Sequence, residues 1–590
     1  MENKPTKKLI EMKNIFGKKT AILLIPVFML GAFACKDSFL DVPVTGQLTE
    51  ETLTSAKGVE GLLIGAYAPM NGRAAGWFSG SSNWLWGSVT GGEANKGSNA
   101  GDQAVAVPVQ RFETEPGNFP INDKWRGMFE GVARSNAVIK NAKVSTDLSD
   151  AAKKRILGEA RFLRGHYYFE LRKLFNKVPF VDETVDYAAG ADKVTNEAEI
   201  LPKIEADFKF AYDNLPETQP AAGRANKWAA GAYLAKTYLY QKKYPDARTL
   251  LTTVIDQGQT TNGKKYALLA KYSDAFNAEF DNSSESVFAI QAAANTGSAD
   301  NANPDFVLNF PYNGGPAGCC GFFQPSFEMA NSFRTAGGLP LLDGSYNLPA
   351  NALKTDQGIQ SKDAFAPDAG PLDPRIDHSI GRRGLPYLDW GPHPGFDWIR
   401  DQSYGGPFAP KKFIYYKAQE GRLTDGSSWT KGYTAMNYNI IRFADVLLMA
   451  AEAEVEAGSL AKAQEYVNLV RRRAANVAGF VKKSDGTDAA NYVISEYTSA
   501  WPDKAVANRA IRFERKLELS GEGHRFFDLV RWGVAATEIN AYLAFESAKL
   551  PNNLGGARFT PNKHEYMPIP QRQIDLQGAD ILKQNTGYTQ

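Results

Sequence analysis

The sequence predicts a mainly α-helical protein: a superhelix of helical pairs with a long loop-rich, partly β insertion and further helices after it. Two segments, residues 233–255 and 437–473, carry apolar residues at the i, i+3, i+4 spacing of amphipathic helices. These segments also match each other position for position. The chain between them is rich in Gly, Pro and aromatic residues, which indicates loops and short strands.

Residues 437–473 are expected to form two antiparallel helices. Gly458 ends the first helix and Ser459 can cap the second, and a joint this short folds one helix back on the other. Small alanines let the two backbones approach closely. The apolar positions of the pair are Ile440, Ile441, Phe443, Val446, Leu447, Met449, Ala450, Leu460, Ala463, Tyr466, Val467 and Val470.

The segment 233–255 repeats this pattern. Its alanines Ala235 and Ala247 are separated by eleven residues, and a turn is expected just before the second of them. That arrangement is tetratricopeptide-like, and each such pair needs neighbours to bury its apolar face. The copies are far apart in the sequence, so we expect a superhelix interrupted by long insertions. The matching residues are Leu234, Ala235, Tyr244 and Ala247 in the first copy and Ala450, Ala451, Leu460 and Ala463 in the second.

The same spacing and capping signals predict the remaining elements in order. The expected helices cover residues 53–70, 125–144, 151–175, 197–215, 227–255 (a pair), 503–520 and 522–542, and the clearest expected strand is 285–291.

The N-terminus has the pattern of a secretory signal. A basic region ends at Lys19, an apolar run covers residues 21–34, and Cys35 follows. The run is too short to span a bilayer. We expect residues 1–34 to be a lipoprotein signal, read from Met1 or Met12, and Cys35 to be lipidated; the alternative is a plain signal with an incidental cysteine.

We therefore expect a tether over residues 35–50 and one domain over 51–590. Its predicted parts are an N-terminal helical part (51–260), the loop-rich insertion (261–436) and a C-terminal helical part with a tail (437–590).

Charge and cysteine usage exclude some classes of protein. The formal charge is +2, but six lysines and two glutamates give residues 1–34 a net +4, which leaves −2 for the rest. A nucleic-acid binder needs a concentrated basic face, so this class is disfavoured. Cys319 and Cys320 are adjacent, and adjacent cysteines rarely join each other; neither has a CxxC partner, so we expect no metal site there.

Charged residues recur at helical-turn spacing in several segments. Because arginine suits partly buried, bidentate pairing with carboxylates, we expect ion-pair networks that join the helical pairs to the loops. The residues concerned are Arg161, Arg164, Arg442, Asp445, Arg515, Glu518, Arg525 and Asp528.

Tryptophans divide into two groups. Trp125, Trp228 and Trp532 fall on apolar helix faces and are expected in the core. The others lie among Gly, Ser and Asn or in the insertion, where an exposed indole could stack on a sugar face while polar side chains bond the hydroxyls. The alternative is that each ring pins its own loop to the scaffold. These others include Trp77, Trp84, Trp86, Trp390, Trp398 and Trp429.

Five segments together resemble the SusD/RagB family of Bacteroidetes outer-membrane nutrient-binding lipoproteins, in the family's order and over nearly the whole chain. They are GEARFLRGHYYFELRKLFNKVPFVDE (158–183), LDPRID (372–377), NYNIIRFADVLLMAAEAEVEAG (437–458), ERKLELSGEGHRFFDLVRWG (514–533) and MPIP…ILKQNTGY (567–588), with FLD (39–41) after the cysteine. The resemblance implies four tetratricopeptide-like pairs that cradle a loop-rich remainder. It also implies a surface lipoprotein that binds nutrient oligomers, usually glycans, as a lid over a SusC-like TonB-dependent transporter.

In such proteins the loop after the first helix commonly supplies the aromatic residues that stack on the ligand. We therefore rank Trp84 and Trp86 first and Trp77 next, with Arg73 and Asn95 as polar partners. Trp390 or Trp429 would form the opposite wall.

The expected function is non-catalytic capture of oligosaccharides for such a transporter. No HExxH or GxSxG motif is present and the five histidines are scattered along the chain. We therefore expect no catalytic residue, no cofactor and no metal ligand set. The sequence leaves open whether a calcium ion stabilises one of the loops. The alternatives are a RagB-like peptide binder, a surface glycosidase with two carboxylates flanking a cleft, and a purely structural partner of the transporter.

Overall fold

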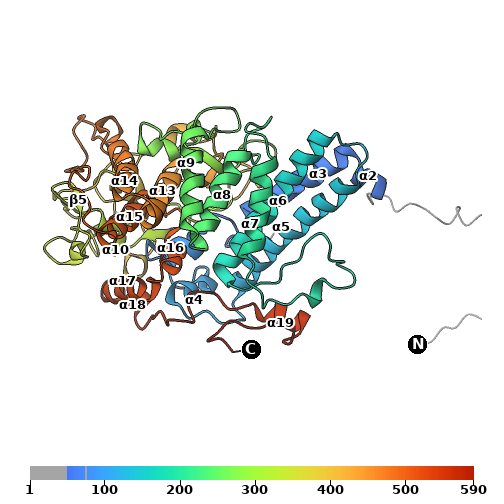
Figure 1. Cartoon of the computed structure of the whole chain (residues 1–590). Coiled ribbons are helices and arrows are strands. Elements are labelled where there is room, and N and C mark those ends of the chain that lie inside the picture. Colours follow the sequence, from blue (N-terminus) through green and yellow to red (C-terminus); the bar gives the residue numbers. More distant parts are fainter. Residues whose placement is uncertain (1–48, 73–75, 590) are drawn as a thin grey trace, which may run out of the picture. The chain divides into compact units, whose positions relative to one another are not determined.

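Helices dominate the structure and follow one another in space much as they do along the chain (Figure 1). The computed structural model describes residues 49–72 and 76–589, so the signal, most of the tether, Cys35 and Arg73 lie outside the described residues. By internal contacts the chain divides into Met1–Leu53 and Thr54–Gln590, and α2 (Glu50–Thr54) lies at that division. The domain boundaries given above stay predictions.

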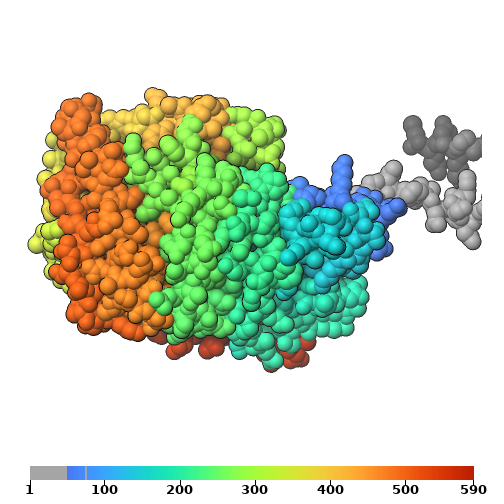
Figure 2. Space-filling view, turned by 45° about the horizontal axis from the view of Figure 1, so that its top comes forward, coloured from blue at the N-terminus to red at the C-terminus, as the bar shows by residue number. Residues whose placement is uncertain are grey.

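An array of long helices forms one side of the unit Thr54–Gln590. Helix α3 packs on α5, and the contacts then run in order through α6, α7, α8 and α9 to α13, which α14 and α15 join. Figure 2 shows this side as a continuous surface, from α5 and α6 in cyan through α9 in green to α14 and α15 in orange. The array comprises α3 (Ala56–Tyr67), α5 (Phe119–Val144), α6 (Asp150–Phe175), α7 (Leu201–Asn214), α8 (Lys227–Tyr240), α9 (Tyr244–Gln257), α13 (Phe443–Ala457), α14 (Leu460–Ala474) and α15 (Lys504–Glu518).

The two predicted helical pairs are confirmed as α8–α9 and α13–α14, and they are direct neighbours, because α9 packs on α13 across the long insertion. Ser459 caps α14 by accepting a hydrogen bond from the backbone N–H of Lys462. The alanines expected at the close approach, Ala235, Ala247, Ala451 and Ala463, are all fully buried. A mainly α, tetratricopeptide-like architecture is therefore confirmed.

Ile440 and Ile441 do not belong to the first helix of the later pair, contrary to the prediction. They lie in β8 (Tyr438–Arg442), which pairs antiparallel with β2 (Ser286–Ile290), the strand expected at 285–291. A short apolar run fits a buried strand as well as a helix, and here the pairing of Phe288 with Ile441 decides between them.

Other helix boundaries also differ from the prediction, such as the start of α7, which lies at Leu201 rather than at residue 197. Helix α5 begins six residues earlier, with Pro120 in its first turn. The single helix expected over 522–542 is two, α16 (Arg525–Arg531) and α17 (Ala535–Lys549), because Gly533 between them has a left-handed φ of 72° that ends the first helix.

The remaining elements are short and lie in the insertion, the first loop and the tail. Among the described residues the strands form four two-stranded antiparallel sheets. No helix of the described part is long and apolar enough to cross a membrane. The short elements are β1 (Ala94–Gly97), β3 (Phe322–Pro325), β4 (Thr335–Ala336), β5 (Leu339–Pro340), β6 (Ile380–Gly381), β7 (Ala409–Pro410), α4 (Val107–Arg111), α10 (Phe327–Ser332), α11 (Ile376–Ser379), α12 (Gln402–Gly405), α18 (Pro551–Leu554) and α19 (Gln571–Gln577).

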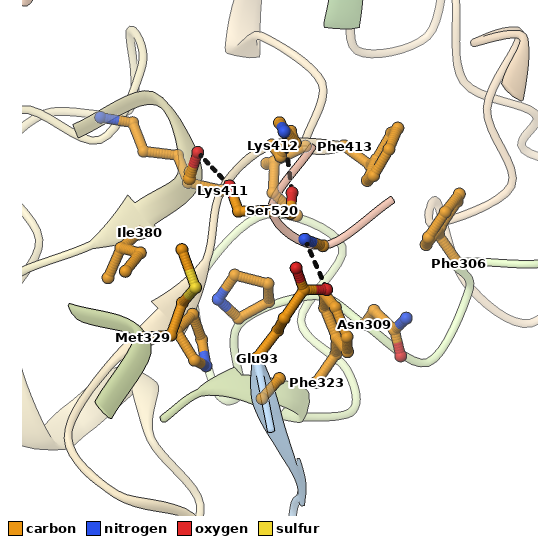
Figure 3. A pocket seen from close by; sticks show the side chains of 16 residues that line it. Glu93, Phe306, Asn309, Phe323, Met329, Ile380, Lys411, Lys412, Phe413 and Ser520 are labelled. Carbon is orange, nitrogen blue, oxygen red and sulfur yellow. Dashed lines mark hydrogen bonds between the residues drawn. The ribbon is translucent and has the colours of Figure 1, made fainter. Parts of the chain in front are cut away.

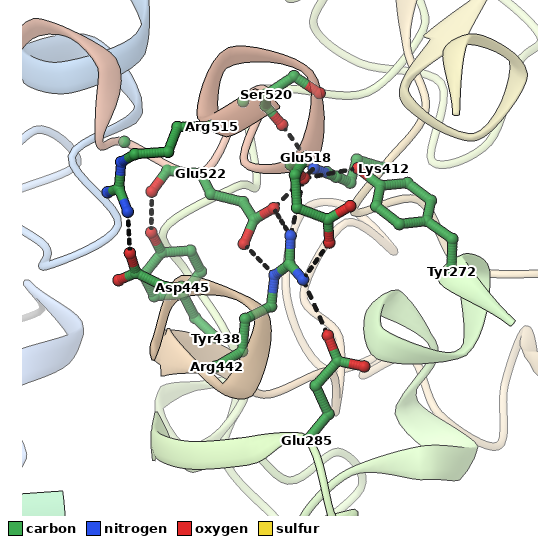
Figure 4. Close-up of polar contacts among 12 residues, drawn as sticks. Tyr272, Glu285, Lys412, Tyr438, Arg442, Asp445, Arg515, Glu518, Ser520 and Glu522 are labelled. Carbon is green, nitrogen blue, oxygen red and sulfur yellow. Dashed lines mark hydrogen bonds and ion pairs between the residues drawn. The ribbon is translucent and has the colours of Figure 1, made fainter. Parts of the chain in front are cut away.

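A buried ion network joins the helical array to the insertion (Figure 4). At its centre Arg442, at the end of β8, donates to Glu522 at 2.7 Å, to Glu285 at 2.8 Å and to Glu518 of α15 at 2.6 Å. Burial alone would raise the pKa of the Glu518 carboxyl, but Arg473, Arg442 and Arg375 hold that pKa well below its ordinary value. Glu518 is therefore ionised at neutral pH, although its side chain is fully buried.

Five cations face five carboxylates in this network, so its buried charge is balanced. Further ion pairs tie in Lys412 and the segment 373–375 of the insertion. The members are Arg375, Lys412, Arg442, Arg471 and Arg473 with Glu285, Asp373, Glu514, Glu518 and Glu522.

The other residues expected in ion pairs do form them, but Asp445 and Arg525 have partners different from those predicted, and Arg525 pairs with Glu538. Arg161 and Arg164 both bind Asp207 of α7 at 2.7 Å. Asp445 does not pair with Arg442; Arg515 binds it at 2.7 Å and Lys236 lies 3.3 Å away.

Replacement of Arg442 by Met should lower the free energy of unfolding by about 3–5 kcal/mol, because it leaves buried carboxylates without their partner. Denaturant unfolding measures this. Arg472→Met is the matched control, since the Arg472–Glu496 pair is exposed, with side chains 60% and 36% accessible, and should cost about 0–1 kcal/mol. Equal small losses in the two variants would contradict the structural role of the network.

Candidate functional site

The two tryptophans ranked first as ligand platforms are buried. Trp84 is 2% exposed and Trp86 1%. The Trp84 ring lies between Phe78 and Phe323, with centroids 5.7 and 5.9 Å away, and the Trp86 indole N–H donates to the Phe78 carbonyl. The prediction that these rings stack on a ligand is wrong in this structure, and the alternative that they pin their loop holds.

Glycine in this loop explains the burial. A Cβ at Gly87 would lie 1.9 Å from the Gly523 carbonyl oxygen, and one at Gly523 would lie 2.0 Å from the Ser82 carbonyl oxygen. The Gly- and Ser-rich composition therefore serves close backbone packing, with the turn Trp84–Val89 held against α16. The sequence pattern is the same as that of an exposed flexible loop.

Asn95 is also buried, which contradicts its predicted role as a polar partner of the ligand. It lies in β1, paired with Gln324 of β3, and its side-chain amide donates to the Glu546 carboxylate at 3.1 Å. Arg73 lies outside the described residues. Trp77 is 39% exposed, and its role stays a prediction.

The tryptophans of the insertion gather around one loop, residues 311–319. Trp390 is half-buried and donates from its indole N–H to the Tyr415 carbonyl at 3.1 Å; the Tyr415 hydroxyl accepts from the Ala317 N–H at 3.0 Å. Trp429, 54% exposed, precedes Thr430, whose hydroxyl donates to the Ala317 carbonyl at 3.2 Å. Trp390 and Trp429 thus border this loop rather than face Trp84 and Trp86.

Three segments distant in sequence converge at the base of the same loop. A Cβ at Gly321 would lie 3.5 Å from the Cβ atoms of Tyr312 and Arg400 and 3.8 Å from the Cα of Ser98. The Tyr312 N–H donates to the Trp398 carbonyl at 2.9 Å. Tyr312 and Trp398 are both half-buried, and this hydrogen bond holds their backbones together near the turn at residues 98–102.

Charged and polar groups complete this site. Arg400 lies over the Tyr312 ring, with 5.1 Å from the guanidinium carbon to the ring centroid, and it pairs with Asp102. Asn99 accepts from the backbone N–H of residue 101 at 3.1 Å and of Asp102 at 3.0 Å, and its Nδ2 makes no hydrogen bond within the described part. We call Asn99, Asp102, Tyr312, Trp398 and Arg400 the aromatic loop surface.

Lys96 fixes the shape of the turn beneath this surface. Burial lowers the pKa of its amine to about 8, while Asp102 opposes that shift. The Lys96 Nζ donates to the carbonyl oxygens of Asn99 at 2.8 Å and of Asp102 at 2.7 Å. The turn therefore offers the Asn99 amide and the Asp102 carboxylate from a rigid support.

Sequence reasoning missed most of the aromatic loop surface. Trp398 was among the insertion tryptophans considered, but Tyr312, Arg400, Asp102 and Asn99 carry no local signal, because their relation depends on pairing between β1 and β3. At the end of the loop, Cys319 and Cys320 form a disulfide, contrary to the expectation that adjacent cysteines stay separate.

A small internal cavity lies behind β1 and β3 (Figure 3). It measures about 30 Å³, room for a water or two and far too small for a sugar. The buried Asn309 amide beside it has no hydrogen-bond partner among the described residues, and burial raises the pKa of the neighbouring Glu93 carboxyl to about 7. Within residues 49–72 and 76–589, no group of three or more His, Cys, Asp or Glu side chains is placed to hold a metal.

Because Trp84 is packed on all sides, Trp84→Ala should lower the free energy of unfolding by about 3–5 kcal/mol. Trp429→Ala removes the same ring from a 54% exposed position and should change it by less than about 0.5 kcal/mol. Denaturant unfolding of both variants checks this. A Trp84→Ala protein as stable as Trp429→Ala would contradict the burial.

Glu546, the partner of Asn95, should make stability depend on pH. Burial raises the pKa of its carboxyl from 4.5 to about 7. The folded state then binds more protons than the unfolded state between about pH 4.5 and 7. The contribution of Glu546 to the free energy of unfolding is therefore fully present below pH 4.5 and is lost as the pH rises to 7.

Glu546→Gln, which mimics the protonated acid, should therefore match the parent in stability at pH 4 and exceed it by about 3 kcal/mol at pH 8. Denaturant unfolding at the two pH values gives the difference. A difference between variant and parent that is the same at both pH values would refute the assignment.

Comparison with known proteins agrees with the resemblance noted in the sequence. Residues 284–588 match the model of the SusD family, and residues 38–239 match a family described as starch-binding and associating with the outer membrane. The chain is 25% identical to a SusD-like protein of Formosa agariphila over 82% of each chain. It is 26% identical to the starch-binding protein SusD of Bacteroides thetaiotaomicron over 75% of this chain and 74% of that one.

The fold is similar to that of solved structures as well. A laminarin-binding SusD-like protein superimposes with a TM-score of 0.63 at 24% identity, covering 90% of this chain and 100% of the other. Since the SusD family model alone spans more than half of the 590 residues and the architecture agrees, the chain belongs to the SusD family.

Proposed function

We propose that this chain is a cell-surface protein that binds oligosaccharides without cleaving them and delivers them to a SusC-like TonB-dependent outer-membrane transporter. The observation that carries the proposal is the aromatic loop surface: two half-buried rings, Tyr312 and Trp398, held beside Arg400, Asp102 and Asn99.

The chemistry of these residues suits a sugar. The C–H faces of a pyranose pack on aromatic rings, while its hydroxyls both donate and accept hydrogen bonds. Arg400 and the Asn99 amide supply donors, and Asp102 supplies an acceptor. Because the Tyr312 N–H binds the Trp398 carbonyl oxygen at 2.9 Å, the backbone under the two rings is held in place and little conformational entropy is lost when a ligand binds.

The relatives support the same ligand class. One relative is named as a starch-binding protein, and a structural neighbour is named for laminarin binding. A few stacked rings and exposed hydrogen bonds, each worth about 1 kcal/mol net, give affinities nearer micromolar than nanomolar, as suits a protein that must release its ligand.

The proposed lipid anchor is based on the N-terminal sequence, and the proposed transporter partner is based on the family resemblance. A lipid on Cys35 would hold the domain at the outer membrane, with residues 35–50 as the tether between the lipid and the domain. The description of the second matching family as associating with the outer membrane supports this location. Trp77, Trp390 and Trp429 stay candidates for further contacts with a long ligand.

Isothermal titration of the protein with starch, laminarin and other plant, algal and host oligosaccharides tests the proposal. Trp398→Ala and Tyr312→Ala should each weaken the binding of the oligosaccharide about fivefold, because each removes a stacking face worth about 1 kcal/mol. Tyr187→Ala is the control, since this ring is 51% exposed on the helical side of the molecule.

Unchanged affinity in both Trp398→Ala and Tyr312→Ala would remove the aromatic loop surface as the site. Chromatography of the oligosaccharides after incubation tests the non-catalytic claim, and shortened products would contradict it.

A further inference from the structure

A groove of about 360 Å³ lies beside α15, α16 and α17, in the size range of small-ligand sites. Arg509, Arg512 and Lys516 line it at successive turns of α15, Arg525 lines it from the start of α16, and Trp532 follows the end of α16. We call these five residues the basic groove. None of them belongs to the aromatic loop surface.

Acidic neighbours compensate only part of this positive charge. Lys516 binds Glu328 at 2.6 Å, and Arg525 makes one long contact of 3.3 Å with Glu538. The third acidic lining residue, Asp343, accepts from the backbone N–H of Ser345 at 3.0 Å and from its hydroxyl at 2.6 Å. The guanidinium groups of Arg509 and Arg512 make no ion pair or hydrogen bond with any residue that the structure describes.

Donor groups without acceptors meet at Arg512. Its guanidinium carbon lies 4.9 Å from the centroid of the Trp532 ring, and both the Arg512 Nε and the Trp532 Nε1 are buried without a partner. Arginine and the indole N–H can donate but never accept. These two N–H groups are shielded from solvent, so the donors that the groove can offer a ligand are the terminal guanidinium nitrogens of Arg509 and Arg512, which have no partner in the described part of the chain.

Not every arginine of α15 lacks a partner. One turn further on, Arg515 binds Asp445 at 2.7 Å and Asp528 at 2.9 Å. Burial, joined by repulsion from Arg531, lowers the pKa of Arg512 despite attraction from Glu452, whereas the carboxylates around Arg515 raise its pKa. Glu452, Glu538 and Glu456 thus attract Arg512 from a distance, but none of them forms an ion pair with it in the described part of the chain.

We propose that the basic groove binds the anionic group of an acidic oligosaccharide, a carboxylate or a sulfate ester, with Arg512 as the main contact and Arg509 and Arg525 beside it. The guanidinium fork matches two oxygens of either group. Phe513 and Val534 supply apolar wall for the sugar ring. The inference rests on the proposed function, in that it takes the ligand to be a saccharide, but it concerns a different surface.

Titration calorimetry of the full chain tests this with a panel of oligogalacturonates, oligoguluronates and sulfated galactans, each beside its neutral counterpart, and with sodium sulfate alone. At least one acidic oligosaccharide should bind more tightly than its neutral counterpart, and higher salt should weaken that binding. Arg512→Gln should weaken it about tenfold or more, and Arg509→Gln, at an exposed position, should weaken it less.

Arg472→Gln is the matched control, because it removes the same charge from an exposed arginine on α14. All three variants should keep the parent's melting temperature within a few degrees and bind neutral oligosaccharides as the parent does. Unaltered acidic binding in Arg512→Gln and Arg509→Gln would overturn the proposal. Sodium sulfate that binds as tightly as the oligosaccharide would overturn the saccharide assignment. Loss of neutral binding in Trp398→Ala, with acidic binding retained, would leave the basic groove as an independent site.

Discussion

The structure depends on compensation of buried charge between the helical array and the insertion. An ionised arginine or glutamate is costly to bury singly, because the loss of hydration costs several kcal/mol per ion and a paired, hydrogen-bonded partner is needed to offset it. Apolar packing is non-directional and tolerates sliding, whereas a guanidinium that binds three carboxylates fixes their positions. Arg442, with Glu285, Glu518 and Glu522, thereby sets β8, the start of β2 and the end of α15 against one another.

Once the insertion is fixed, its loops have a rigid foundation. Lys412 and Arg375 bring the segments that flank the β6–β7 pair into the network. The next layer, a small apolar cluster around Tyr387 and Tyr415, supports Trp390 and Trp398 at its edge. Half-buried rings on such a support keep one orientation without a ligand, which is what a recognition surface for a weakly bound polymer needs.

Side chains of the same type have different roles in this chain, according to whether neighbouring groups pair with them or cover them. Arg442 and Arg515 each bind at least two carboxylates and act in the scaffold, whereas Arg512, on the same helix as Arg515, forms no ion pair within the described part of the chain. Among the aromatic side chains, Trp84 is enclosed by other rings, whereas Trp429 is more than half exposed. Residue type alone distinguishes neither pair.

The sequence by itself determined the helical pairs, the cap at Ser459, the strand near residue 287, the ion-pairing role of the arginines and the family. The helices, the cap and the strand depend on periodicity and capping within a few residues, and the family assignment depends on motifs that occur along the chain in the family's order. Tertiary structure alone decided which rings reach solvent, that Asn95 is buried, that Ile440 and Ile441 form a strand, and which arginine lacks a partner. The reason is physical: exposure depends on what packs on a residue, and the backbone that covers the Trp84 loop is at Gly523, more than four hundred residues away along the chain.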